Sequence, residues 1–143
     1  VRLAWRDVLA LPQVEVVADL HGGTGWSCRG LRWEGVPMRA LVEACEPTPE
    51  ARYLLARDAE TYSAGLPIEA ATVPDTLLAL KLDGEPLAPD RGGPLRLVVP
   101  SRYAWKSVKW VRALLFGEQP EPGFWESRGA HPDGDPWKEQ RQA

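Results

Sequence analysis

Frequent glycine and proline restrict this chain to short elements joined by many turns. Its 143 residues include 13 Gly and 14 Pro, whereas these two types together usually make up roughly 12% of a protein. Proline cannot continue a helix or a central strand, and glycine weakens both. We therefore expect abundant loops. The length of the chain is that of one domain, which we expect to cover residues 1–143 and to have a single core.

Short apolar patterns of two kinds lie between the turns. A β-branched run over 14–20 predicts a first strand that ends at the His21–Gly25 loop, and Asp83-Gly84 is a strong hairpin signal. Helical spacing is confined to short stretches, one ending at Pro12 and one starting at Pro37. Strands outnumber helices and do not alternate regularly with them, which predicts an α+β domain with a mixed sheet rather than a doubly wound fold.

Composition and apolar spacing also predict the elements in the rest of the chain. The tail, 116–143, is broken by Pro and Gly and is predicted to be mostly coil packed on the domain, with Trp125 and Trp137 as its tethers. We expect further strands within 31–38, 51–58, 75–87, 94–100 and 107–116, a loop at 59–67 and a single helical turn at 67–73.

Charge and cysteine content exclude several classes of protein. With 17 Lys and Arg against 20 Asp and Glu, the net charge of −3 repels nucleic acid. No apolar run approaches the ~18 residues that span a bilayer. Cys28 and Cys45 are too few for a disulfide framework or a four-cysteine zinc site. This favours a reducing compartment, and hence the cytoplasm over the periplasm, although removal of a leader ahead of Val1 would reopen the question.

Two basic segments could bind an anion. Ser101–Trp110 packs Arg102, Lys106 and Lys109 among hydroxyls and tryptophans, and lysines beside turn amides suit a compact phosphate. The same composition also describes a solvated basic strand that its tryptophans anchor. Asp90–Arg96 offers glycines for close approach and an arginine that can fork onto a phosphate, or it is a plain surface loop.

The stretch Asp19–Gly30, "DLHGGTGWSCRG", leaves several roles open. His21 stands at a predicted strand end, where it could be a site residue or could hydrogen-bond locally. Cys28 could be a reactive thiol or a ligand. "GWSCR" has Arg29 where a nucleophile elbow needs its second glycine, which disfavours acyl transfer. "HGGTG" lacks the spacing of a dinucleotide-binding loop.

Five segments in order resemble the oxidoreductase molybdopterin-binding domain family, and together they cover nearly the whole chain. The resemblance is to the short, single-domain bacterial members of this family, which has the sulfite oxidase type of fold. It implies that the chain binds molybdopterin, the molybdenum cofactor. The segments are "LPQVEVVADLH…GWS", "RWEGVPMRALVEACEP", "YSAGLPIEAA", "LLALKLDGEPLAPDRGGPLRLVVPSRYAWKSVKWV" and "GFWESRGAHPDGDPWKEQR".

The resemblance also implies which residues hold the cofactor. Arg96 and the turn at 107–109 would contact the pterin and its phosphate, with Lys106 nearby, and His21 and Gly22 would line the pocket beside the dithiolene. Asp58 and Arg91 stand at two further contact positions, where this chain departs from the family pattern. The implied set is His21, Gly22, Asp58, Arg91, Arg96, Lys106, Ser107, Val108 and Lys109.

One position departs from the family in a way that affects the metal. In a family pattern like His-Cys-x-x-Gly-Trp-Ser, the cysteine ligates molybdenum, and here Gly22 occupies that place without a side-chain donor. Cys28 could substitute only if the loop folds back, because six extended residues cover ~20 Å. Two functions therefore remain open.

The first of these functions is oxygen-atom transfer to or from a small sulfite- or sulfoxide-type substrate, with electrons from a separate protein. The second is a catalytically inactive relative that acts as a binding or interaction module. Metal analysis distinguishes the two, because only the first requires molybdenum.

Overall fold

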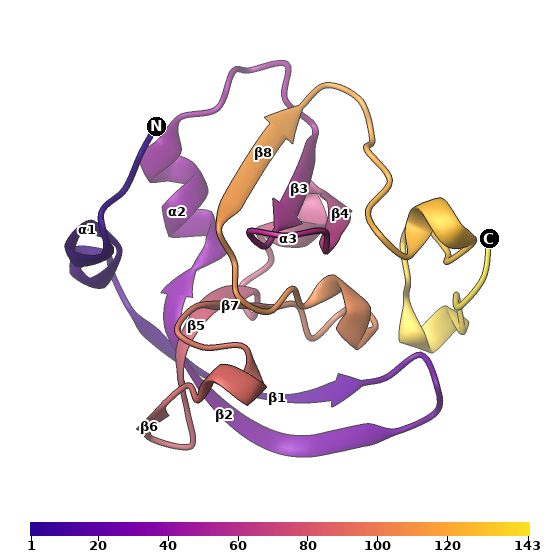
Figure 1. Ribbon diagram of the computed structural model, residues 1–143, viewed down its shortest axis with the longest axis horizontal. Coiled ribbons are helices and arrows are strands. Elements are labelled where there is room, and N and C mark those ends of the chain that lie inside the picture. Colours follow the sequence, from indigo (N-terminus) through magenta and orange to yellow (C-terminus); the bar gives the residue numbers. More distant parts are fainter.

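The strands form two antiparallel sheets, and every helix is short (Figure 1). The computed structural model describes all 143 residues. The first sheet has the order β1-β2-β5-β6, with β7 also paired to β5, and the second has the order β4-β3-β8. The strands of the first sheet are β1 (Val14–His21), β2 (Ser27–Pro37), β5 (Leu77–Leu82), β6 (Glu85–Pro86) and β7 (Arg96–Val98), and those of the second are β3 (Tyr53–Arg57), β4 (Ser63–Pro67) and β8 (Ala113–Gly117).

The helices connect or cover the sheets without forming a layer of their own. Proline sets the start of two of them, because Pro37 and Pro67 directly precede α2 and α3. The α-helices are α1 (Trp5–Ala10), α2 (Met38–Cys45) and α3 (Ile68–Ala71), and the 3-10 turns are η1 (Pro89–Arg91), η2 (Ala104–Lys106), η3 (Glu126–Arg128) and η4 (Pro136–Lys138). None of them has the length and apolar character that a bilayer crossing requires.

The main core lies between the two sheets and α2. Val36 and Leu97 come from the first sheet, Leu54 from the second and Met38 from α2, and all are almost fully buried. A smaller cluster around Trp33 and Leu77 covers the other face of the first sheet. The α+β class expected from the sequence is confirmed, because the two sheets are accompanied by a few short helices.

The chain's tail returns to the first hairpin. It leaves β8, passes β4 and then runs beside the tip of the β1–β2 hairpin, where the Arg141 Nε donates a hydrogen bond to the Gly23 carbonyl at 3.1 Å (Figure 1). The buried ammonium of Lys106 holds the tail through Glu126 Oε1 at 2.6 Å and the Pro132 carbonyl at 2.6 Å. These contacts place the tail against the turn that follows β1.

Two details of the sequence-based assignment are wrong. Residues 63–67, expected in a loop, form β4, because their backbone pairs with β3. Within 107–116 only residues from 113 on are strand, because Ser107 and Val108 turn inward to bond Val99 and Leu97. Trp137, expected as a tether, is 70% exposed but packs edge-on against the His21 ring with 5.5 Å between ring centroids, and the buried Lys106–Glu126 pair anchors the tail as well.

Candidate functional site

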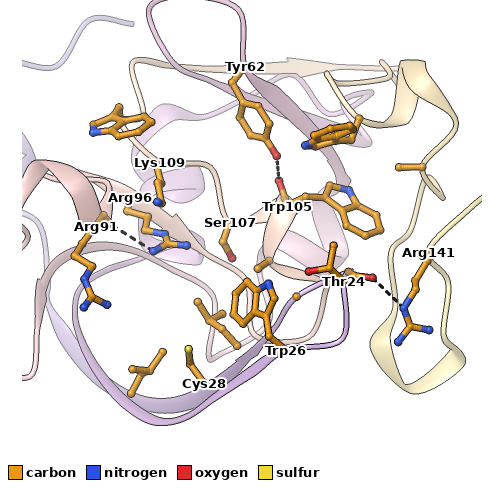
Figure 2. A pocket seen from close by; sticks show the side chains of 18 of the residues that line it. Thr24, Trp26, Cys28, Tyr62, Arg91, Arg96, Trp105, Ser107, Lys109 and Arg141 are labelled. Carbon is orange, nitrogen blue, oxygen red and sulfur yellow. Dashed lines mark hydrogen bonds between the residues drawn. The ribbon is translucent and has the colours of Figure 1, made fainter.

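A large cavity lies between the tip of the β1–β2 hairpin, the loops before β7 and before β8, and the tail (Figure 2). Its volume of about 1050 Å³ is that of a site for a cofactor-sized ligand. Hydrophobic and aromatic side chains make up about half of the lining residues, and the remainder includes several cations. Such a mixture suits a ligand with both ring systems and negative charge.

Three cations, from η1, the start of β7 and the loop before β8, form one wall of this cavity. Arg91, Arg96 and Lys109 all line it, and none of them makes an ion pair with an acid. Burial, and then the charge of Arg91, lower the pKa of Arg96. Burial and the charges of Arg96 and Arg91 lower the pKa of Lys109, against the opposing effect of Asp90. The wall therefore carries unbalanced positive charge, which a bound anion would neutralise.

Gly92 allows the cations to converge. It has a φ of 98°, which favours glycine, and a Cβ there would lie 2.7 Å from the Lys109 Cγ and 3.1 Å from the Arg96 Cδ. The Lys109 Nζ donates to the Asp90 carbonyl at 3.2 Å, and the Trp110 indole donates to the Pro89 carbonyl at 2.7 Å. The turn at 89–92 and the segment at 109–110 thus hold each other in place.

Several buried donors at the cavity lack a partner within the protein. Arg96 is 9% exposed and Trp33 is 1% exposed, yet the Arg96 Nε and the Trp33 Nε1 make no hydrogen bond. The Ser107 Oγ accepts from the Val99 amide at 2.9 Å, which leaves its own hydrogen free to donate. Unpaired buried donors are costly, so their clustering at one cavity indicates a ligand with acceptor atoms.

Tryptophans line the cavity and its mouth. Trp26, Trp110 and Trp125 line the cavity and are each about half-exposed. Trp105 on η2 also lines it (Figure 2). The Tyr62 hydroxyl donates to the Trp105 carbonyl at 2.5 Å and so fixes that loop. Burial, and then the charge of Glu126, raise the pKa of Tyr62 far above its ordinary value, which keeps this hydroxyl protonated as a donor.

Gly22 lies on the cavity wall in direct contact with Trp26. A Cβ at position 22 would overlap the indole ring of Trp26, so the present packing has no room for a side chain there. The Gly22 amide is also occupied, because it donates to the Trp26 carbonyl at 2.8 Å. The glycine that stands where the family pattern has its metal-binding cysteine is therefore a packing position in this structure.

The structure places four of the sequence-predicted residues away from the cavity. Those that line it are Gly22, Arg91, Arg96, Ser107 and Lys109, together with Cys28, whereas His21, Asp58, Lys106 and Val108 do not. The His21 Nδ1 is paired with the Ser27 Oγ at 2.8 Å on the other face of the hairpin. The Asp58 carboxylate accepts from the Glu60 and Tyr62 amides.

Lys106 and Val108 are committed to the protein interior. All three donors of the Lys106 ammonium are used, by the Gly65 carbonyl at 2.7 Å and by the two tail contacts described above. Val108 is fully buried in the main core, and its carbonyl accepts from the Leu97 amide. Both residues therefore shape the loop that carries Ser107 and Lys109, and neither faces the cavity.

Many lining residues lie outside the predicted set, and three of them make or lack specific polar contacts. Trp33 reads as an ordinary core residue of a strand, and only its unpartnered nitrogen marks it. Tyr62 lies in the segment expected to be loop, and its hydroxyl was the available signal. Arg141 comes from the tail, more than a hundred residues from the Gly23 carbonyl that it contacts, and no local pattern indicates such a pairing.

Comparison with known proteins gives a consistent result. The family model described as "Oxidoreductase molybdopterin binding domain" matches residues 1–125. The chain is 41% identical over 139 residues to the uncharacterized oxidoreductase YuiH of Bacillus subtilis (strain 168), an alignment that covers 97% of this chain and 70% of YuiH.

More distant relatives are longer proteins. The chain is 31% identical over 142 residues to the protein-methionine-sulfoxide reductase catalytic subunit MsrP of Campylobacter jejuni, covering 87% of this chain and 48% of that protein. Among solved structures, the sulfane dehydrogenase SoxCD from Paracoccus pantotrophus superimposes with a TM-score of 0.75 at 27% identity, over 82% of this chain and 35% of that one. The chain thus spans about half the length of that reductase subunit.

Proposed function

The chain belongs to the oxidoreductase molybdopterin-binding domain family, and from that premise we propose that its cavity holds molybdopterin and that the loaded protein transfers an oxygen atom. The observation that carries this proposal is the wall of three cations without an acidic partner, in which the buried Arg96 Nε lacks a hydrogen bond. A phosphorylated ring cofactor supplies both the negative charge and the acceptor atoms that such a wall can bind.

The residues present fit the organic part of this cofactor. We assign Arg91, Arg96 and Lys109 to its phosphate, because they provide the uncompensated charge. The free hydrogen of the Ser107 hydroxyl and the unpartnered Trp33 indole nitrogen suit polar atoms of a heterocycle. The aromatic side chains around them suit its ring faces.

The protein's own contribution is binding, orientation and exclusion of water. When bound, the cofactor supplies the molybdenum on which an oxygen atom is exchanged together with two electrons. The cations neutralise the cofactor's charge, while Trp105 and its neighbours limit access of water to the cavity. Tyr62 holds its proton toward the Trp105 carbonyl and so stabilises the wall rather than acting as a base.

The mouth of the cavity favours an organic oxo substrate over a small inorganic anion. Trp26, Trp110 and Trp125 present half-exposed indoles there, which offer apolar contact to a sulfoxide-bearing group. The relatives named protein-methionine-sulfoxide reductase support the same substrate class. Electrons would come from a separate donor protein, and nucleic acid is not among the partners that we propose.

Production in a host that makes the molybdenum cofactor tests the proposal. We expect pterin and molybdenum to copurify with the chain, and we expect reduction of methyl sulfoxides by a reduced viologen dye to exceed reduction of nitrate. Denatured protein and free cofactor at the same molybdenum concentration serve as controls. Protein that contains neither pterin nor metal under these conditions would contradict the proposal.

A second candidate function is a pterin-binding or interaction module without redox chemistry. The packing of Trp26 against Gly22 favours it, because no side chain can approach a metal from position 22. This candidate predicts purified protein that contains pterin but no molybdenum and does not reduce sulfoxides. Stoichiometric molybdenum would eliminate it.

A further inference from the structure

The β1–β2 hairpin brings Cys28 back beside the cavity. The Gly22 amide bonds the Trp26 carbonyl at 2.8 Å, and beyond that bond His21 is opposite Ser27 and Leu20 is opposite Cys28. The chain therefore reverses within 22–26. Residue 28 is a diagonal neighbour of residue 22, a relation that separates Cα atoms by roughly 7 to 8 Å in antiparallel pairs.

Alternation along the hairpin places Cys28 on its cavity face. Residues directly opposite each other in an antiparallel pair share a face, and successive residues alternate between faces. Leu20 and Cys28 both line the cavity, whereas His21 and Ser27 bond each other on the opposite face. Figure 2 shows the Cys28 sulfur directed into the cavity beneath Arg96.

The buried donors and the cation near Cys28 indicate that an anionic group binds beside its thiol. Arg96 is 9% exposed and keeps an unpartnered Nε at this cavity, and the buried Trp33 indole nitrogen is likewise unpartnered. Cys28 lies close enough to Arg96 for its negative charge to oppose the lowering of the Arg96 pKa by burial and by Arg91. The sulfur of Cys28 and the unpartnered donors therefore face the same cavity.

We propose that Cys28 supplies the protein sulfur to the metal of the bound cofactor, in place of the missing side chain at position 22. This inference rests on the proposed function. Cys28 is the soft donor that lines the cavity, and Cys45, the other cysteine, packs against the main core at the end of α2. On binding, the Cys28 thiol loses its proton to solvent and a metal–sulfur bond forms, with no change in the metal's oxidation state.

X-ray absorption at the molybdenum edge tests the assignment on loaded protein. Cys28→Ser is compared with the matched control Cys45→Ser and with the unchanged chain, and pterin content is measured in all three. We expect Cys28→Ser to lose one molybdenum–sulfur bond, and we expect Cys45→Ser to keep the sulfur count of the unchanged chain. In the loaded Cys45→Ser variant, we also expect Cys28 to resist alkylation and to become reactive once the cofactor is removed.

The outcomes distinguish the two proposals. If pterin is bound and the sulfur count is the same in both variants, the assignment of Cys28 is wrong while the proposed function stands. Cys28 that is alkylated equally fast with and without cofactor would also overturn the assignment. If no pterin is found in the unchanged chain, the proposed function fails, and this inference fails with it.

Discussion

At the residue scale, small changes of side chain decide what the cavity can hold. A glycine at position 22 removes a possible ligand and makes room for the Trp26 indole, while a glycine at position 92 lets Lys109 and Arg96 approach each other. Cys28 gains importance through its position opposite Leu20 rather than through any motif of its own. The chemistry of the site thus depends on which positions lack a side chain as much as on those that carry one.

The contact between Gly22 and Trp26 predicts a coupled pair of substitutions. Gly22→Ala forces the Trp26 indole away from the backbone and should lower the free energy of unfolding by about 1 to 3 kcal/mol, the usual cost of overpacking. Adding Trp26→Ala removes the overlap, so the double variant should be more stable than the sum of the single effects predicts. Denaturant unfolding of all four proteins measures this coupling, and simple additivity would show that the two residues do not compete for space.

The lowered pKa of Lys109 predicts how anion binding depends on pH. Burial and the charge of Arg96 lower its pKa in the free protein, and a bound anion favours the protonated form. The affinity for the anion is therefore greatest at pH values below this lowered pKa. It falls as the pH rises through that pKa, which lies at a lower pH than the pKa of an ordinary lysine. Phenyl phosphate, whose second pKa is about 6, keeps its charge over the alkaline range and is a suitable probe.

Calorimetric titration of phenyl phosphate at several pH values measures this decline, and Lys109→Arg provides the comparison. Arginine keeps its charge in the same range, so we expect the variant to retain affinity where the unchanged chain loses it. A decline at the same pH in both proteins would mean that a different group titrates.

At the element scale, one buried ion pair attaches the tail to the sheets. Lys106 on η2 is fully buried and bonds Glu126 on η3 at 2.6 Å, and the same glutamate accepts from the Gly65 amide on β4 at 3.0 Å. This junction holds three elements that are far apart in the sequence. It also fixes the turn that carries Ser107 and Lys109 to the cavity.

Removal of the Lys106 ammonium should therefore destabilise the fold strongly. Lys106→Met leaves Glu126 buried without its cation, which costs about 3 to 5 kcal/mol in comparable pairs. We expect a matching loss in the free energy of unfolding and faster proteolysis within 117–143. The control Lys81→Met changes an exposed lysine on β5 and should alter neither quantity appreciably. Equal stability of the two variants would show that the pair does not anchor the tail.

At the scale of the whole molecule, the sequence predicts the local elements and part of the site. Strand β1, helix α2 and the hairpin at Asp83-Gly84 follow from patterns of adjacent residues. Basic side chains and glycines mark the segments of Arg96 and Lys109 as possible anion sites, and the family resemblance places the two residues at one site, where both line the cavity. Such signals lie in adjacent residues, so they can be recognised without knowledge of the fold.

The rest depends on contacts that no local pattern encodes. Lys106 and Lys109 are similar in the sequence, yet one is buried in an ion pair and the other faces the cavity, because the turn between them reverses direction. Arg141 reaches Gly23 only because the tail folds back across the molecule. The distance estimated for Cys28 from an extended chain is too long because residues 22–26 form a tight turn.

The measurement that tests the central claim most directly is the pterin content of Arg96→Met purified from a host that makes the cofactor. Arg57→Met is the matched control, since Arg57 is exposed on β3 outside the cavity. Loss of a charged hydrogen bond costs about 1.5 to 3 kcal/mol, or roughly 10- to 150-fold in affinity. The account predicts that Arg96→Met loses most of its pterin while Arg57→Met and the unchanged chain retain it. Equal pterin content in Arg96→Met and Arg57→Met would contradict it.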